Sequence, residues 1–200
     1  MLDNISTELA LFIESSRSVM PLLVKIIGAL WVFNIFNWLV KSRFNLLGIF
    51  PRKIYGLPGI FFSPILHADF THLLFNTLPL FTLSLFILSL GVDLYIRVTA
   101  IIWILQGILV WLFGRKGNHI GASGVIAGYF AFVLAQAIDR PSVTTLFIGG
   151  IALYYFGGIL LSLLPSEERV SWEGHLFGFI AGIFVVYAQS NPFLHALLFF

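Results

Sequence analysis

The chain has 200 residues, of which 59% are hydrophobic and 10% are charged, and its formal net charge is +2. About a quarter of the residues of a soluble domain are charged, and one core of this size could not bury so many apolar side chains. The composition therefore excludes a soluble globular protein, and the small, scattered positive charge argues against a nucleic-acid partner. The absence of cysteine excludes disulfides, thiolate metal sites and a cysteine nucleophile. We predict an all-α polytopic protein whose surroundings are the lipid bilayer.

The predicted elements begin with a short charged segment. Residues 1–19 carry four charged side chains and lack the basic start and cleavage site of a secretory signal, so we expect an amphipathic lead-in. A helix needs about 20 apolar residues to span the hydrocarbon core. Six segments meet or approach this length, and they run from about 21 to 40, 71 to 90, 94 to 113, 123 to 138, 143 to 164 and 174 to 189. We predict one six-span domain over residues 20–190 and a short apolar tail, residues 191–200, that lies along the surface.

The first connection between spans, residues 41–66, is much longer than the others. It combines three prolines and three glycines with aromatic residues such as Phe50, Tyr55 and Phe61. Aromatic side chains among glycine and proline are typical of a structured loop at the membrane interface rather than a flexible tether. We therefore expect a long, structured first loop.

Four polar side chains within or beside the spans could carry chemistry: His72, Asn76, Ser123 and His175. A serine hydroxyl becomes a good nucleophile when a base takes its proton, and histidine is the usual base. His72 and Asn76 are spaced i, i+4, so they share one helix face and both can donate to a developing oxyanion. The backbone N–H of Ser123, at a helix N-terminus, can add a further donor. Together they contain the parts of an acyl-transfer site.

Glycines predict how two of the spans meet. Gly174, Gly178 and Gly182 form a stripe on the sixth predicted span, and Gly124 and Gly128 lie on one side of the fourth. Small residues at this spacing let helix backbones approach closely in lipid. Close packing there would bring the ring of His175 to Ser123.

At these residues the chain resembles the rhomboid family of intramembrane serine proteases. The resemblance lies in Gly121-Ala122-Ser123-Gly124, in His67-x4-His72-x3-Asn76, and in Gly-His-Leu-Phe-Gly at residues 174–178. The three motifs occur in the family's order on the family's six-span core, over about residues 20 to 190. Gly121 and Gly124, which flank the serine, are part of the match.

The resemblance implies a Ser123–His175 dyad without a catalytic acid. It implies oxyanion contacts from Asn76, His72 and the N–H of Ser123, with His67 supporting the local hydrogen-bond network. We expect no cofactor and no metal. The resemblance implies substrates that are single-span membrane proteins cut in or near their transmembrane segment. It also implies a multi-pass protein of a bacterial inner membrane, with cytoplasmic termini and an active site that faces the outer side.

Two positions differ from the common family pattern. Many members carry Trp-Arg in the first loop, where this chain has Pro58-Gly59, and an aromatic residue commonly follows the serine by four positions, where this chain has Ala127. We expect Tyr129 to face elsewhere. The lysine and arginine count also opposes the family topology, since seven of the 11 cations lie in the odd-numbered connections. Counted literally, the positive-inside rule places the long loop in the cytoplasm.

Other interpretations stay open at this point. Taken singly, Ser123 would be a helix cap and Asn76 a polar contact between two helices. A rhomboid-like protein that binds transmembrane clients without cutting them is the main alternative function, and a transporter or metal carrier that uses the five histidines is the third. We expect His119 to be a loop residue and Glu173 to point away from His175, so neither is assigned to the site. The sequence predicts no oligomeric state.

Overall fold

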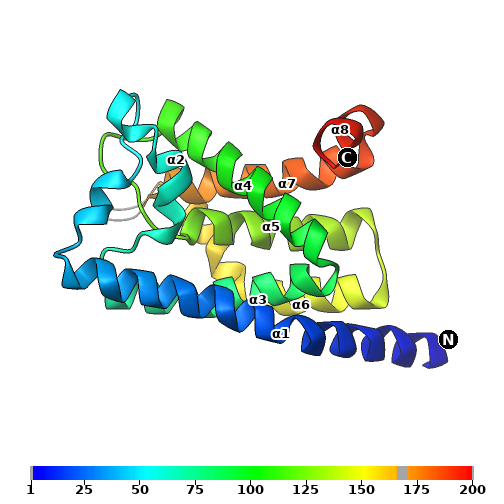
Figure 1. The fold of residues 1–200 in the computed structure, drawn as a ribbon. Helices are drawn as coiled ribbons and strands as arrows, with labels where there is room; N and C mark the ends of the chain where they lie inside the picture. The colour runs from blue at the N-terminus through cyan, green and yellow to red at the C-terminus, as the bar shows by residue number, and fades with distance from the viewer. Residues whose placement is uncertain (1, 166–170, 200) are drawn as a thin grey trace.

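The computed structural model describes residues 2–165 and 171–199, and this part of the chain is helical with no strand. The long helices are α1 (Leu2–Leu39), α3 (Phe70–Ser89), α4 (Val92–Phe113), α5 (Ser123–Asp139), α6 (Val143–Phe156) and α7 (Trp172–Ser190). A short helix, α8 (Pro192–Leu198), ends the chain, and a 3-10 helix, η4 (Gly157–Leu163), continues α6. Figure 1 shows the long helices side by side in one bundle, with α5 near its centre.

The first helix starts much earlier than the sequence pattern indicated. We expected a separate lead-in before a span from about residue 21, but α1 is continuous from Leu2 and passes through Pro21. Contacts with the bundle hold this part of the helix. The Glu8 carboxylate accepts from the backbone N–H of Thr144, at 3.3 Å, and the rings of Phe12 and Phe86 are 6.3 Å apart. The helix therefore begins well before the expected start of the first span, because a few charged side chains do not end a helix. The expected domain limits stay a prediction.

The helices are those of a polytopic membrane protein. Four of the described stretches are long and apolar enough to cross a bilayer: Ile5–Leu39, α3, α4, and Val143–Leu163, which joins α6 to η4. The pair α7 and α8 is a fifth if it counts as one span, although it bends by 109° at its break. The predicted count of six spans therefore stays a prediction. A shorter apolar helix, α5, has 17 residues, 12 of them buried by neighbouring helices.

The contact between α5 and α7 is built on glycine, as the spacing predicted. A Cβ atom at Gly178 would overlap the carbonyl oxygen of Gly124, and one at Gly182 would overlap that of Gly128. The two helix backbones therefore touch, and only glycine fits at these positions. Because Gly124 follows Ser123 and Gly178 lies one turn after His175, this contact fixes the relative position of those two residues.

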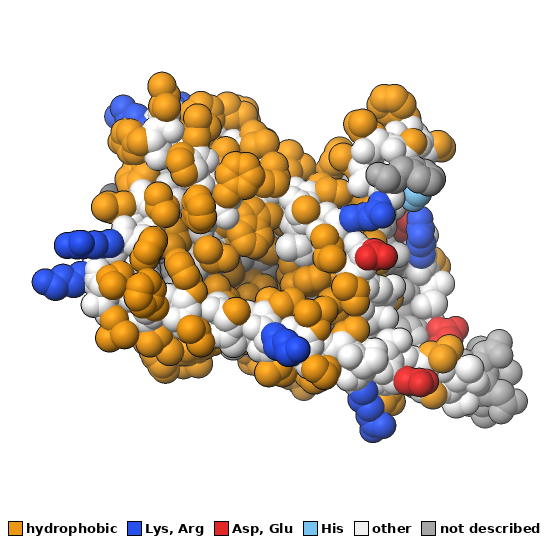
Figure 2. Space-filling model, viewed as in Figure 1, with side chains coloured by type: hydrophobic (Ala, Val, Ile, Leu, Met, Phe, Trp, Pro, Cys, Tyr) orange, Lys and Arg blue, Asp and Glu red, His pale blue; other side chains and the backbone are white. Residues whose placement is uncertain are grey.

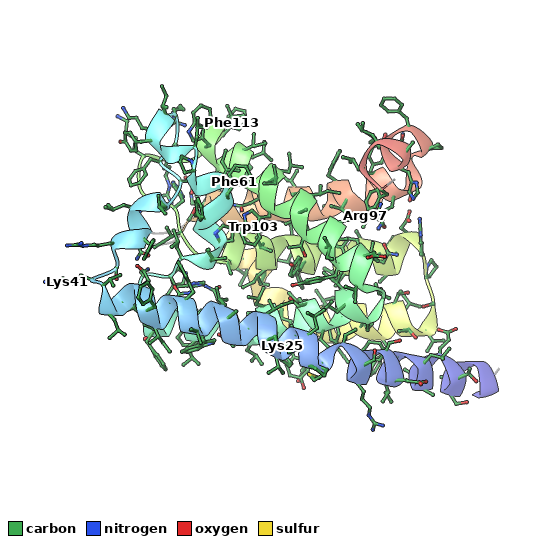
Figure 3. The ribbon with its side chains drawn as sticks, viewed as in Figure 1. Lys25, Lys41, Phe61, Arg97, Trp103 and Phe113 are labelled. Atoms are coloured by element: carbon green, nitrogen blue, oxygen red, sulfur yellow. The ribbon has the colours of Figure 1, made fainter. Side chains whose placement is uncertain are left out.

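The long first loop is structured, as expected. It contains three 3-10 turns and one helical turn: η1 (Arg43–Leu47), η2 (Ile54–Gly56), α2 (Gly59–Phe62) and η3 (Ser63–Ile65). Trp103 of α4 donates from Nε1 to the carbonyl of Ile60 at 3.0 Å, so the loop is fixed to the bundle. Phe61, beside this contact in Figure 3, is 61% exposed. Figure 2 shows hydrophobic side chains over most of this face, which suits a surface in contact with lipid.

Candidate functional site

Ser123 is the first residue of α5, and the turn before it is held from two sides. The N–H of Gly121 donates to the carbonyl of Ser63 at 2.8 Å, and the N–H of Ala122 donates to His67 Nε2 at 3.4 Å. Gly121 has a φ of +117°, and a Cβ atom there would lie 2.7 Å from the ring of His72. The turn therefore requires glycine both for its backbone conformation and for the approach of His72.

His67 supports this turn as a neutral ring. It is fully buried, and burial lowers its pKa to about 3, because the charged form would lose its hydration. The neutral ring can accept at Nε2, which is the role that the N–H of Ala122 requires. The backbone N–H of His67 donates to Asn34 Oδ1 of α1 at 2.9 Å. The sequence-based expectation that His67 takes part in the local hydrogen-bond network agrees with this geometry.

The start of α3 positions His72 and Asn76. Asp69 is the N-cap, and its Oδ1 accepts from the N–H of His72 at 2.8 Å. The ring of His72 lies against Gly121, with its centroid 5.0 Å from that of His67. One turn later, the buried Asn76 Nδ2 has no hydrogen-bond partner within the described part of the chain. An unpaired buried amide donor is costly, so this group needs an acceptor.

His175 lies in the first turn of α7, and a backbone carbonyl orients its ring. Ser171 caps the helix, with its hydroxyl accepting from the N–H of Gly174 at 3.3 Å. His175 Nδ1 is 3.2 Å from the carbonyl oxygen of Ser162 in η4. A carbonyl only accepts, so the hydrogen bond requires the proton on Nδ1 and leaves Nε2 with a lone pair. This tautomer is the one in which Nε2 can act as a base.

The structure brings Ser123, His175 and Asn76 to one cavity of about 260 Å³. The three residues come from α5, α7 and α3, and α6 and η4 supply most of the remaining wall. No hydrogen bond joins Ser123 to His175 in the described residues. The other two predicted polar residues, His72 and His67, do not line this cavity. They contact the turn at Gly121 and Ala122 from its other side.

Two residues that we did not assign to the site have structural roles beside it. Glu173 points away from His175, and its Oε1 accepts from Arg115 Nε at 2.6 Å and from the Arg115 N–H at 3.1 Å. His119 Nδ1 is 2.7 Å from the Ser171 hydroxyl. Both contacts tie the loop before the serine to the N-terminus of α7. They confirm that Glu173 does not face His175 and that His119 is a loop residue.

One part of the site was missing from the sequence-based prediction. Ser162 acts through its main-chain oxygen, and a carbonyl has no signature in the sequence. The only signal was Gly157-Gly158, about two thirds of the way along the predicted fifth span, where α6 changes to the 3-10 helix that carries Ser162. Tyr129, in contrast, is buried away from the cavity as expected, with its hydroxyl 2.6 Å from Thr99 Oγ1. Within the described residues, no three or more His, Asp or Glu side chains converge as metal ligands would.

Comparison with known proteins agrees with this architecture. Residues 54–192 match the family model of the rhomboid domain. An uncharacterized protein of Mycobacterium tuberculosis is 38% identical over 175 residues, which cover 83% of this chain and 73% of that protein. YdcA of Bacillus subtilis, a candidate rhomboid protease by its name, is 32% identical over 126 residues, which cover 59% of this chain and 60% of that protein.

The fold and the cavity define the class of a polytopic α-helical membrane protein with a serine and a histidine at the ends of two packed helices. The chain belongs to the rhomboid family. Members of this family are generally intramembrane serine proteases.

Proposed function

We propose that this protein is an intramembrane serine endopeptidase that cuts single-span membrane proteins in or near their transmembrane segment. The observation that carries the proposal is the single cavity lined by Ser123, His175 and Asn76. Polar groups at membrane depth are costly and usually functional, and these three have complementary chemical roles. We propose that it is a multi-pass protein of a bacterial inner membrane.

In the proposed reaction, His175 Nε2 takes the proton of the Ser123 hydroxyl as the oxygen attacks the scissile carbonyl. The carbonyl of Ser162 holds the opposite ring nitrogen, so a backbone group takes the orienting role that an acid has in a triad. The proton on Nε2 then passes to the leaving amine, and the acyl group stays on Ser123 until water hydrolyses it. The hydrogen bond from His175 Nδ1 to the carbonyl of Ser162 also compensates for Ala127, because an alanine at that position gives the histidine ring no aromatic neighbour.

The negative charge that develops on the substrate oxygen needs donors already in place. Asn76 Nδ2 is a buried donor with no partner among the described residues, so it is available for that oxygen. The N–H of Ser123, in the first turn of α5, has no acceptor within its own helix and adds the favourable end of the helix dipole. His72 is a third candidate donor from behind the Gly121 turn.

The substrate must present an unwound backbone to this site. A transmembrane helix keeps its carbonyl groups in i to i−4 hydrogen bonds, and cleavage requires local opening of these bonds. Segments with glycine, proline or polar residues open most easily. We propose such segments as substrates, with a small residue before the scissile bond because the cavity is only about 260 Å³.

The main alternative is a rhomboid-like protein that binds transmembrane clients without cutting them. The observation in its favour is that no hydrogen bond joins Ser123 to His175 in the described part of the chain. Apo active sites often have longer catalytic contacts than their substrate complexes, so the missing hydrogen bond does not decide between the two functions. Reaction with a fluorophosphonate probe does, because only an activated serine is labelled.

We expect the wild-type protein in detergent to be labelled by a fluorophosphonate at Ser123, and His175→Ala to lose this labelling. Removing the base costs roughly three orders of magnitude or more in rate, and adding Ser123→Ala to His175→Ala should cost little further, because a dyad acts as a unit. Labelling rates and single-turnover cleavage of a model transmembrane substrate measure this. Additive losses in cleavage would mean that the two residues act in separate steps, and unlabelled wild-type protein would favour the client-binding alternative.

We also expect the end of the bundle that holds Ser123 to face away from the cytoplasm, despite the cation count. Asn118 precedes α5 and Pro141 follows it, so the two lie at opposite ends of that helix. Both residues are neutral, so substitution by cysteine leaves the charge distribution unchanged in this cysteine-free chain. Asn118→Cys in intact cells should react with an impermeant maleimide, and Pro141→Cys only after the membrane is opened. The reverse pattern would mean that the positive-inside rule sets the orientation.

A further inference from the structure

A second polar cavity lies at the opposite end of the bundle from Ser123. It has a volume of about 290 Å³ and lies between α4, α5, α7 and α8; its lining residues are Asp93, Leu94, Arg97, Gln136, Arg140, Gln189, His195 and Phe199. Gln136 is 13 residues after Ser123 on α5, which places the two ends of that helix about 20 Å apart. This cavity therefore takes no part in the proposed proteolysis.

The charges in this cavity are of both signs and are only partly paired. Asp93 and Arg97 are one turn apart on α4, but no ion pair within 4.0 Å joins them in the described structure. Arg140 Nε is 3.5 Å from Asp139 Oδ2, and both side chains are partly exposed. In Figure 3, Arg97 lies beside the corner between α7 and α8. A carboxylate and a guanidinium that line one cavity without closing on each other leave room for a group with both charges.

Two amides also line the cavity. The Oε1 atoms of Gln136 and Gln189 are buried and without a hydrogen-bond partner within the described residues. These oxygens accept hydrogen bonds, so the two glutamines add acceptors rather than donors to the cavity. Asp93 is a further acceptor, and Arg97 and Arg140 supply donors to the same cavity. Donors of this kind suit phosphate oxygens.

The corner between α7 and α8 places the cavity at the depth of lipid headgroups. The chain bends by 109° between the two helices, which is what a chain does when it leaves the bilayer and continues along its surface. Phe193 and Leu197 of α8 are 76% and 66% exposed. Exposed apolar side chains on a short terminal helix favour a position at the boundary between headgroups and acyl chains.

We propose that this cavity binds the phosphoethanolamine headgroup of a membrane phospholipid. The phosphate lies against Arg97 and Arg140, and the ammonium group donates to the Asp93 carboxylate. A choline headgroup has the same charges but no N–H to donate, and a glycerol headgroup has the phosphate without a cation. The cavity therefore selects ethanolamine phospholipids over both.

Native mass spectrometry of the detergent-solubilised full chain tests this selectivity. Wild-type protein should bind phosphatidylethanolamine about tenfold more tightly than phosphatidylcholine, because one hydrogen bond to a charged group contributes about that factor. Asp93→Asn should bring the two lipids to equal affinity, and Arg97→Gln should weaken both. Lys25→Gln is the matched control, because Lys25 is an exposed cation on α1, away from the cavity in Figure 3, and it should bind as wild type does.

Three outcomes would overturn the proposal: phosphatidylglycerol bound as tightly as phosphatidylethanolamine, unchanged selectivity in Asp93→Asn, or soluble phosphoethanolamine bound as tightly as the lipid. The last would point to a soluble ligand. Asp93 also lies in the first turn of α4, where a negative charge stabilises the helix. Melting without added lipid therefore has to show that Asp93→Asn is folded, and Asp93→Ser replaces it if it is not. Proteolytic activity does not enter any of these readouts.

Discussion

Ser123→Ala should abolish cleavage of a model transmembrane substrate and leave the protein folded. Loss of the nucleophile typically costs three or more orders of magnitude in rate. The hydroxyl lines the cavity and makes no hydrogen bond within the described structure, so its removal leaves no group unpaired. We expect expression and melting temperature close to wild type. Single-turnover cleavage by purified protein in detergent or proteoliposomes measures the loss.

Ser89→Ala is a suitable control for that experiment. Ser89 ends α3 at the far end of the bundle, and its hydroxyl only donates to the carbonyl of Phe86 at 2.8 Å. It should keep wild-type cleavage. Substantial cleavage by purified Ser123→Ala would mean that another group attacks the substrate, and the proposed assignment of the nucleophile would then be wrong.

That α5 and α7 pack together, with Ser123 and His175 at one cavity, was predictable from the sequence because glycine spacing describes backbone contact directly. Gly124 and Gly128 on one helix and Gly178 and Gly182 on the other have no side chains whose packing could vary. Once the two stripes face each other, the register of the helices is fixed. The cap of α3 was predictable for a similar reason, since Asp69 acts on the N–H three residues later.

Features that depend on contacts between distant parts of the chain could not be predicted from local sequence patterns. The extension of α1 to Leu2 depends on Thr144 and Phe86, which are far from it in sequence. The orientation of His175 depends on the main-chain oxygen of Ser162, and any residue type could supply that atom. The short length of α5 reflects its burial, because a helix covered by other helices does not need to match the thickness of the bilayer on its own.

Gly178→Leu should remove activity and destabilise the fold together. Even the first atom of the new side chain would overlap the carbonyl oxygen of Gly124, which is part of the backbone and cannot rotate away. Overpacking commonly costs about 1–3 kcal/mol where side chains can adjust, and we expect at least this much here. Because Gly124 is bonded to Ser123, separating the helices would also move the serine away from His175. Thermal unfolding and substrate cleavage of the same preparation measure both effects.

Gly150→Leu is the matched control, because this glycine is also in a membrane helix but is exposed, with nothing within 4 Å of an added Cβ atom. It should melt and cleave substrate as wild type does. This result would show that a leucine in an apolar helix is not harmful by itself. Gly178→Ala should lie between the two, since it adds the overlapping atom without the rest of the side chain. If Gly178→Leu stayed fully active with an unchanged melting temperature, α5 and α7 could not be in backbone contact, and the geometry that brings His175 to Ser123 would have to be abandoned.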